Sequence, residues 1–220
     1  MEISYRLFLL AFLNVCLSCS VLFTRPAQTE DELRLLEAAY NGDQALVLQL
    51  LEAGISPNIE ESRYSQGSVL YNAVSQGHRG VVELLLRHNV QVSVADNEGN
   101  TPLSAAVINN DEIMVRDLIS RGALVDIADD TGDTPLHEAM RHGNIRICQL
   151  LIAQGANYYR VNNNGLTPVD IARGRGHENV ITQLSRPYIY RALTSGQLLA
   201  PLRAQNPPFL ALSLPEEIVQ

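Results

Sequence analysis

The segment His137-Glu138-Ala139-Met140-Arg141-His142 contains the residue types of a zinc-hydrolase helix, in which two histidines bind the metal ion and a glutamate activates water. That chemistry needs histidines four residues apart, so that both lie on one face of the helix. Here they are five residues apart, a rotation of about 500° that places them on different faces. The spacing argues against a metal site, and we expect this chain to bind neither a metal ion nor a cofactor.

A second cluster, Asp126, Asp129, Asp130 and Asp133, has the carboxylates that calcium prefers. A calcium loop also needs a glycine at its sixth position and a glutamate at its end, and neither falls in register here. We interpret these aspartates as turn residues on a solvent-exposed hairpin.

Covalent catalysis finds no support either. The chain has no G-x-S-x-G nucleophile motif. All sixteen basic residues are arginines, which excludes P-loop phosphate binding, Schiff-base chemistry and kinase-type catalysis because each needs a lysine. We therefore expect a protein that is not an enzyme.

The composition is that of a globular chain of 220 residues, with 46% hydrophobic and 18% charged positions. Sixteen arginines against 24 acidic residues give a formal net charge of −8, which argues against binding driven by the phosphates of nucleic acids. Of the three cysteines, Cys16 and Cys19 lie in an N-terminal apolar run, so no disulfide framework or thiolate metal site is expected.

A repeat of 33 residues organises most of the chain. Its clearest copies begin at Thr101-Pro102, Thr134-Pro135 and Thr167-Pro168, and weaker copies begin at Ser68 and Leu33. Threonine caps a helix and proline suits its first position, so each copy predicts a helix there. Nine residues after its start, each copy has a residue that adopts the left-handed conformation in which helices end. These residues are Gly42, Gly77, Asn110, Gly143 and Gly176.

Apolar residues three to five apart predict a second helix in each copy. Cys148 takes a position that holds Val or Ile in the other copies, so we expect an inert core thiol. The helices end at Gly54, Asn89, Gly122 and Gly155. Tight turns with a glycine at positive φ are then predicted at 96–99, 129–132 and 162–165.

A 33-residue unit of turn, helix and helix that begins Thr-Pro-Leu-His resembles the ankyrin repeat, and the resemblance extends from about Asp31 to Ser185. It implies an all-α solenoid of about five helix-turn-helix repeats with β-turn or hairpin loops. It also implies structural roles for His137, which would hydrogen-bond neighbouring loops, and for His78 and His177, which follow the helix-turn glycines.

The expected domain organisation has four parts. It comprises a signal peptide or membrane anchor (1–20), a linker (21–30), the repeat domain (31–187, with repeats at about 31–60, 64–95, 96–128, 129–161 and 162–187) and a Leu/Pro-rich tail or cap (188–220). The first copy lacks the Thr-Pro pair and the last has Tyr188 where a closing glycine is expected. Such departures are typical of terminal, capping repeats.

The resemblance also implies a protein partner, which would dock on the concave side formed by the hairpin tips and the exposed positions of the first helices. By repeat position, that surface consists of Tyr64, Ser75, Gln76, Asn97, Glu98, Asn100, Ile108, Asn109, Asp130, Thr131, Asp133, Arg141, His142, Asn163, Asn164 and Arg175. Tyr64 and Ile108 are large side chains among polar neighbours, as interface anchors are.

Basic residues gather toward the C-terminal end of this surface, at Arg141, His142, Arg173 and Arg175, whereas the tips Glu98, Asp130 and Asp133 are acidic. We hypothesise from this distribution that the partner presents an acidic surface to the region between Arg141 and Arg175.

The stretch from Leu7 to Phe23 is almost continuously apolar and follows Arg6. It is typical of a secretory signal peptide, in which Ser18 and Ser20 favour cleavage after Ser20. The alternative is an uncleaved membrane anchor formed by residues 7–23. The first interpretation predicts a secreted or periplasmic protein and the second a membrane-anchored one.

Residues 188–220 are too apolar for a simple linker, which favours a cap on the last repeat. A second interpretation uses Leu214-Pro215-Glu216-Glu217-Ile218, which resembles the start of an F-box helix, an adaptor element of ubiquitin ligases. A chain without lysine also offers ubiquitin no acceptor side chain. Two settings therefore stay open, a scaffold in a bacterial envelope and an exported bacterial effector that binds a host protein.

Overall fold

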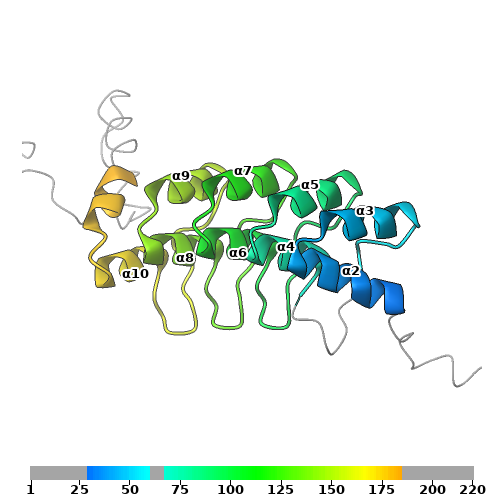
Figure 1. Ribbon diagram of the computed structural model, residues 1–220. Helices are drawn as coiled ribbons and strands as arrows, with labels where there is room; N and C mark the ends of the chain where they lie inside the picture. The colour runs from blue at the N-terminus through cyan, green and yellow to red at the C-terminus, as the bar shows by residue number, and fades with distance from the viewer. Residues whose placement is uncertain (1–28, 60–66, 185–220) are drawn as a thin grey trace, which may run out of the picture.

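The computed structural model describes residues 29–59 and 67–184 (Figure 1). Within those ranges all regular structure is helical, and the helices occur in pairs. The first helices of the pairs are α2 (Glu30–Asn41), α4 (Val69–Ser75), α6 (Pro102–Ile108), α8 (Pro135–His142) and α10 (Pro168–Gly174). The second helices are α3 (Gln44–Glu52), α5 (Arg79–Arg87), α7 (Glu112–Ser120), α9 (Ile145–Ala153) and the helical residues 178–184.

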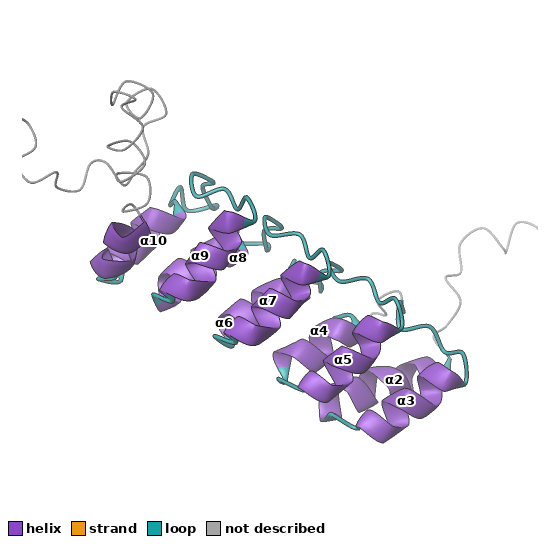
Figure 2. Ribbon diagram, turned by 90° about the horizontal axis from the view of Figure 1, so that it is seen from above, coloured by secondary structure: helices purple, strands orange, loops and turns teal. Residues whose placement is uncertain are grey.

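The array consists of two rows of helices and a row of hairpins. The first helices lie in one row, the second helices lie over them, and the loops that join successive pairs extend from the opposite side of the first row (Figure 1). Seen from above, the pairs follow one another along a single direction (Figure 2). Contacts run from α2 to α4, α6, α8 and α10 in order. The predicted all-α solenoid is confirmed.

The helices start where the repeat predicts. Thr101, Thr134 and Thr167 are the N-cap residues of α6, α8 and α10, each followed by proline in the first turn, and Ser68 caps α4. The helix ends are confirmed too, because all nine residues expected in the left-handed conformation have φ between 56° and 90°. They are Gly42, Gly54, Gly77, Asn89, Asn110, Gly122, Gly143, Gly155 and Gly176.

The first helix begins earlier than its repeat position suggests. α2 has 12 residues, and its N-cap is Thr29 instead of the expected start at Leu33. The side chain of Glu32 accepts from the Thr29 N–H at 2.7 Å, and Thr29 Oγ1 accepts from the Glu32 N–H. This capping box extends the helix by a turn into the segment expected to be a linker.

A continuous apolar core lies between the two rows of helices. The alanine five residues after the start of each repeat is almost completely buried, which lets neighbouring helices approach closely. These residues are Ala38, Ala73, Ala106, Ala139 and Ala172. Cys148 of α9 is buried in the same core, and burial raises the pKa of its thiol to about 12. The thiol stays protonated at neutral pH, as expected of an inert core residue.

Each hairpin is closed by the side chain of its first residue. Asp129 Oδ1 accepts from the backbone N–H groups of Thr131 and Asp133, and Asp96 and Asn162 do the same in their own hairpins. Backbone bonds also join the hairpins to one another: the Asp130 N–H donates to the Glu98 carbonyl at 2.9 Å. The hairpins therefore form a connected row, beside which the first helices lie.

Candidate protein-binding surface

The surface expected to bind a partner combines two elements of the array. We call it the inner face: the exposed sides of α2, α4, α6, α8 and α10 together with the hairpins 96–99, 129–132 and 162–165. Most of the expected residues are exposed there, and Ser75 is half-buried. The exposed ones are Gln76, Asn97, Glu98, Ile108, Asn109, Asp130, Thr131, His142, Asn163, Asn164 and Arg175.

The expected anchor Ile108 is exposed on the inner face, and so is Tyr40, which was not among the expected contact residues. Ile108 ends α6 with 46% of its surface exposed. Tyr40 takes the equivalent position in α2, seven residues after Leu33 as Ile108 is seven after Thr101, and is 49% exposed. The repeat phase could have identified Tyr40 from the sequence. Tyr64, the other expected anchor, lies outside the described residues.

Several expected contact residues also hold neighbouring repeats together. The Asn109 side chain donates to the carbonyls of Val74 and Ser75, at 3.1 and 2.9 Å, at the C-terminal end of α4. The Asn163 side chain donates to the Asp130 carbonyl at 2.8 Å. Asn100 is half-buried and donates to Asp96 in its own hairpin. These amides fix the inner face before any partner arrives.

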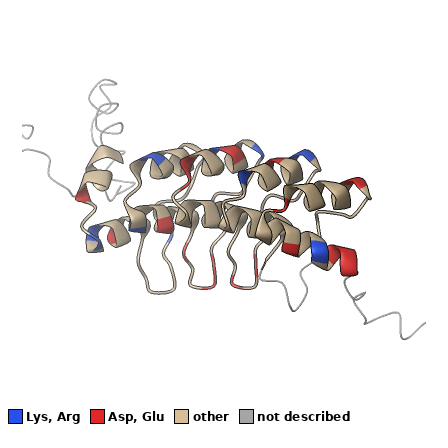
Figure 3. Ribbon diagram, in the orientation of Figure 1, with Lys and Arg blue, Asp and Glu red and all other residues tan. Residues whose placement is uncertain are grey.

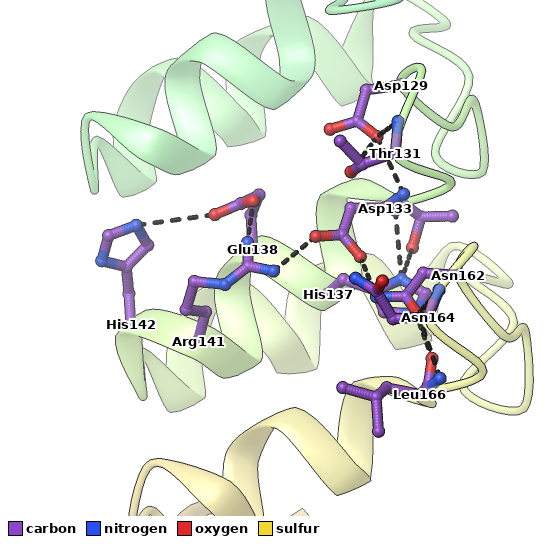
Figure 4. Close-up of polar contacts among 11 residues, drawn as sticks. Asp129, Thr131, Asp133, His137, Glu138, Arg141, His142, Asn162, Asn164 and Leu166 are labelled. Atoms are coloured by element: carbon purple, nitrogen blue, oxygen red, sulfur yellow. Dashed lines mark hydrogen bonds and ion pairs between the residues drawn. The ribbon is translucent and has the colours of Figure 1, made fainter.

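Asp133 does not face solvent as expected, because only 7% of its surface is exposed. Its Oδ1 accepts from the Asn162 side chain at 2.7 Å, and its Oδ2 accepts from Arg141 (Figure 4). Burial by itself raises the pKa of this carboxyl, but the hydrogen bonds from Arg141 and Asn162 outweigh it and hold the pKa below the usual value. Asp133 is a structural ion between two repeats.

Arg141 is engaged by two carboxylates instead of being free for a partner. Its guanidinium lies between Asp133 and Glu138, and Glu138 also lies 3.8 Å from Nε2 of the exposed His142 (Figure 4). Arg173 pairs with Asp170 at 3.2 Å. The basic region behind the acidic-partner hypothesis is therefore largely neutralised, and Arg175 alone of its arginines forms no ion pair with the residues that the structure describes.

His137 is fully buried and performs the structural role that its motif implies. Its Nδ1 accepts from the Thr134 N–H at 3.0 Å, so Nε2 carries the proton and donates to the Leu166 carbonyl at 3.2 Å. The ring thus ties the start of α8 to the next hairpin (Figure 4). Burial lowers the pKa of His137 and outweighs the opposing hydrogen bond to Leu166.

The remaining structural histidines form a second recurring contact. His78 Nε2 lies 3.0 Å from the Tyr40 carbonyl, and His177 Nε2 lies 3.2 Å from the Arg141 carbonyl. Each ring lies against the helix-ending glycine of the preceding repeat: a Cβ at Gly42 or Gly143 would approach the ring within 2.7 Å. These contacts join successive repeats at the end of the first helices.

The buried His137 makes stability depend on pH. Because its folded-state pKa lies below the unfolded value of about 6.5, its contribution is complete above that pH and is lost as the pH falls through the folded-state pKa. The lowered pKa of Asp133 acts only in stronger acid, below about pH 3.9. We expect urea unfolding to show a larger loss of stability between about pH 7 and pH 5 for the natural chain than for His137→Ser. Equal losses in the two proteins would contradict this assignment.

The described residues contain neither a cluster suited to a metal ion nor a helix suited to crossing a membrane. Among residues 29–59 and 67–184, no group of three or more His, Cys, Asp or Glu side chains is arranged to hold a metal ion. No helix in these ranges combines the length and apolar character needed to cross a bilayer.

Helix pairs that repeat every 33 residues, joined by linked hairpins, define a helical repeat protein with an extended inner face. Within that class the chain belongs to the ankyrin repeat family. The family model for ankyrin repeats (3 copies) matches residues 35–129 and 114–190, which together make up more than half of the chain. Ankyrin repeats are typically non-enzymatic scaffolds for protein–protein interaction.

Relatives from distant organisms share this region. The chain is 39% identical over 84 residues to the 2-5A-dependent ribonuclease of Homo sapiens, covering 38% of this chain and 11% of the relative. It is 36% identical over 67 residues to the ankyrin repeat-containing protein P1E11.10 of Schizosaccharomyces pombe (30% and 31%). It is 36% identical over 70 residues to a putative ankyrin repeat protein of Rickettsia felis (31% and 22%). The chain thus matches less than a third of the length of each of these relatives.

Proposed function

We propose that this protein is a non-enzymatic binding module whose inner face docks another protein. The observation that carries the proposal is the pair of exposed apolar side chains, Tyr40 and Ile108, at equivalent positions of α2 and α6. Large side chains that remain half exposed beside polar neighbours are typical interface anchors. The preformed amide contacts of Asn109 and Asn163 support the proposal, because a rigid surface loses less entropy when it binds.

Site-specific crosslinking tests the docking face whatever the identity of the partner. A photo-crosslinking residue replaces Ile108 in the full chain, expressed in its native cells. The matched control replaces Ile113 of α7, which is 52% exposed but lies in the row of second helices. We expect a discrete protein adduct from position 108 and none from position 113. Adducts from position 113 alone, or the same adducts from both positions, would refute docking on the inner face.

We further propose that the chain is exported or attached to a membrane through its N-terminal apolar segment, residues 7–23. The support is the composition of that segment, which lies outside the described residues. The intact mass of protein recovered from its cells tests this: loss of about twenty N-terminal residues indicates export, with an envelope protein or a host protein as partner. Retention of the segment in the membrane fraction indicates an anchored scaffold, and retention in the soluble cell fraction refutes the proposal.

A further inference from the structure

The two anchors of the inner face are two repeats apart. Tyr40 and Ile108 occupy equivalent positions in α2 and α6, and Ser75 lies at the same position of α4 between them. Because neighbouring packed helices lie about 8–10 Å apart, the anchors are separated by about 16–20 Å. A partner that covers both must therefore present two apolar side chains at that separation, with the half-buried Ser75 between the two anchors.

The inner face that carries these anchors also carries exposed negative charge. Glu98 and Asp130 are exposed at the tips of adjacent hairpins, and Glu37 is exposed on α2, one turn before Tyr40. None of these three carboxylates forms an ion pair within the part of the chain that the structure describes. Figure 3 shows acidic residues along the hairpins between α5 and α6 and between α7 and α8. Asp96 and Asp129 add their charges there while closing the turns.

The positive groups of the inner face do not offset this charge. Arg141 lies between Asp133 and Glu138, and those two carboxylates more than neutralise it. His142 and Arg175 lie at the ends of α8 and α10, in the last two repeats and therefore far along the array from Tyr40. The inner face thus carries exposed carboxylates on α2 and on the hairpins before α6 and α8 that have no ion-pair partner among the described residues, within a chain of net charge −8.

We propose that the inner face binds a basic segment of another protein, with two apolar side chains that contact Tyr40 and Ile108 and lysines or arginines that face Glu98 and Asp130. The proposal rests on the docking function proposed above and names the chemistry of the partner. It reverses the acidic partner expected from the sequence, because the ion pairs of Arg141 and Arg173 leave that region with little free positive charge. Complementary charge of this kind raises the association rate and selects among partners.

A displayed library of random sixteen-residue peptides, selected on the full-length chain, provides the probe. We expect the selected peptides to carry a net positive charge together with at least two large apolar residues. One selected peptide is then titrated against the natural chain and against the double variant Glu98→Gln, Asp130→Asn. The variant should bind it at least about tenfold more weakly and with a shallower dependence on salt concentration.

A second double variant, Asp117→Asn with Glu52→Gln, is the matched control. It removes the same two charges from exposed positions on second helices, α7 and α3, and should change the Kd less than about twofold. Equal weakening in both double variants would overturn the proposal, because only net charge would then matter. Thermal unfolding of each variant confirms that it is folded at the temperature of the titration.

The selection separates the partner chemistry from the docking function. Acidic or uncharged peptides whose binding is lost in Ile108→Ser would overturn the basic partner while supporting docking on the inner face. Basic peptides that bind Ile108→Ser and Tyr40→Ser as well as the natural chain would overturn both. Enrichment of no peptide also counts against the proposal, because the library contains the proposed class.

Discussion

Replacement of His137 by alanine is expected to lower the free energy of unfolding by about 4 kcal/mol. The imidazole is fully buried, so its removal leaves a cavity in the array. It also leaves the Thr134 N–H and the Leu166 carbonyl without the ring that bonds them at 3.0 and 3.2 Å. Each buried polar group that loses its partner costs about 1–3 kcal/mol. Urea denaturation followed by circular dichroism measures the loss.

The His137 ring both caps the start of α8 and links it to the next hairpin, and the variant His137→Ser removes only the link. Serine already performs the cap in α6, where Ser104 Oγ accepts from the Thr101 N–H at 2.8 Å. We expect His137→Ser to restore about 1 kcal/mol relative to alanine, since it returns an acceptor to the Thr134 N–H but cannot reach Leu166. A loss below about 1 kcal/mol for His137→Ala would show that the ring does not join the repeats.

The sequence predicts the positions of helices and turns well because local physics determines them. Thr-Pro at a helix start, glycine or asparagine at positive φ, and apolar residues at helical spacing each act within a few residues. The early start of α2 is the exception, although Thr29 and Glu32 form a recognisable capping box. The repeat phase places the start of this helix at Leu33, and a local signal that departs from the phase is easily overlooked beside it.

The candidate site is harder to predict because its charged side chains contact residues that the repeat pattern does not place beside them. Asp133 has the sequence position of an exposed hairpin residue, but Asn162, 29 positions later, covers it and donates to it. Arg141 has the position of a free basic residue, but Asp133, eight positions earlier, reaches it across the turn of the chain. The contact of Asn162 depends on the packing of one repeat on the next, and that of Arg141 depends on how the hairpin folds back on its own helix. The periodicity of the sequence reveals neither. The sequence positions of the basic residues therefore favour an acidic partner, whereas the ion pairs in the structure favour a basic one.

The connected hairpins give the inner face its rigidity, and one glycine shows how closely they approach. Gly132 has a φ of 81°, and a Cβ there would lie 2.8 Å from the backbone nitrogen of Asn163. Gly165 occupies the same turn position with a φ of 73°, but no described atom lies within 4 Å of its Cβ position. Both glycines adopt the left-handed conformation, but only at Gly132 would an added Cβ also clash with the next hairpin.

Replacement of Gly132 by alanine is accordingly expected to lower the free energy of unfolding by about 3 kcal/mol, whereas Gly165→Ala should cost about 1 kcal/mol. The cost for Gly165 is the strain of a left-handed conformation with a Cβ atom, and the difference measures the contact between hairpins 129–132 and 162–165. Urea unfolding of both variants gives that difference directly. Equal losses would mean that the hairpins yield easily, in which case a partner would have to order them and the inner face would lose its advantage as a preformed surface.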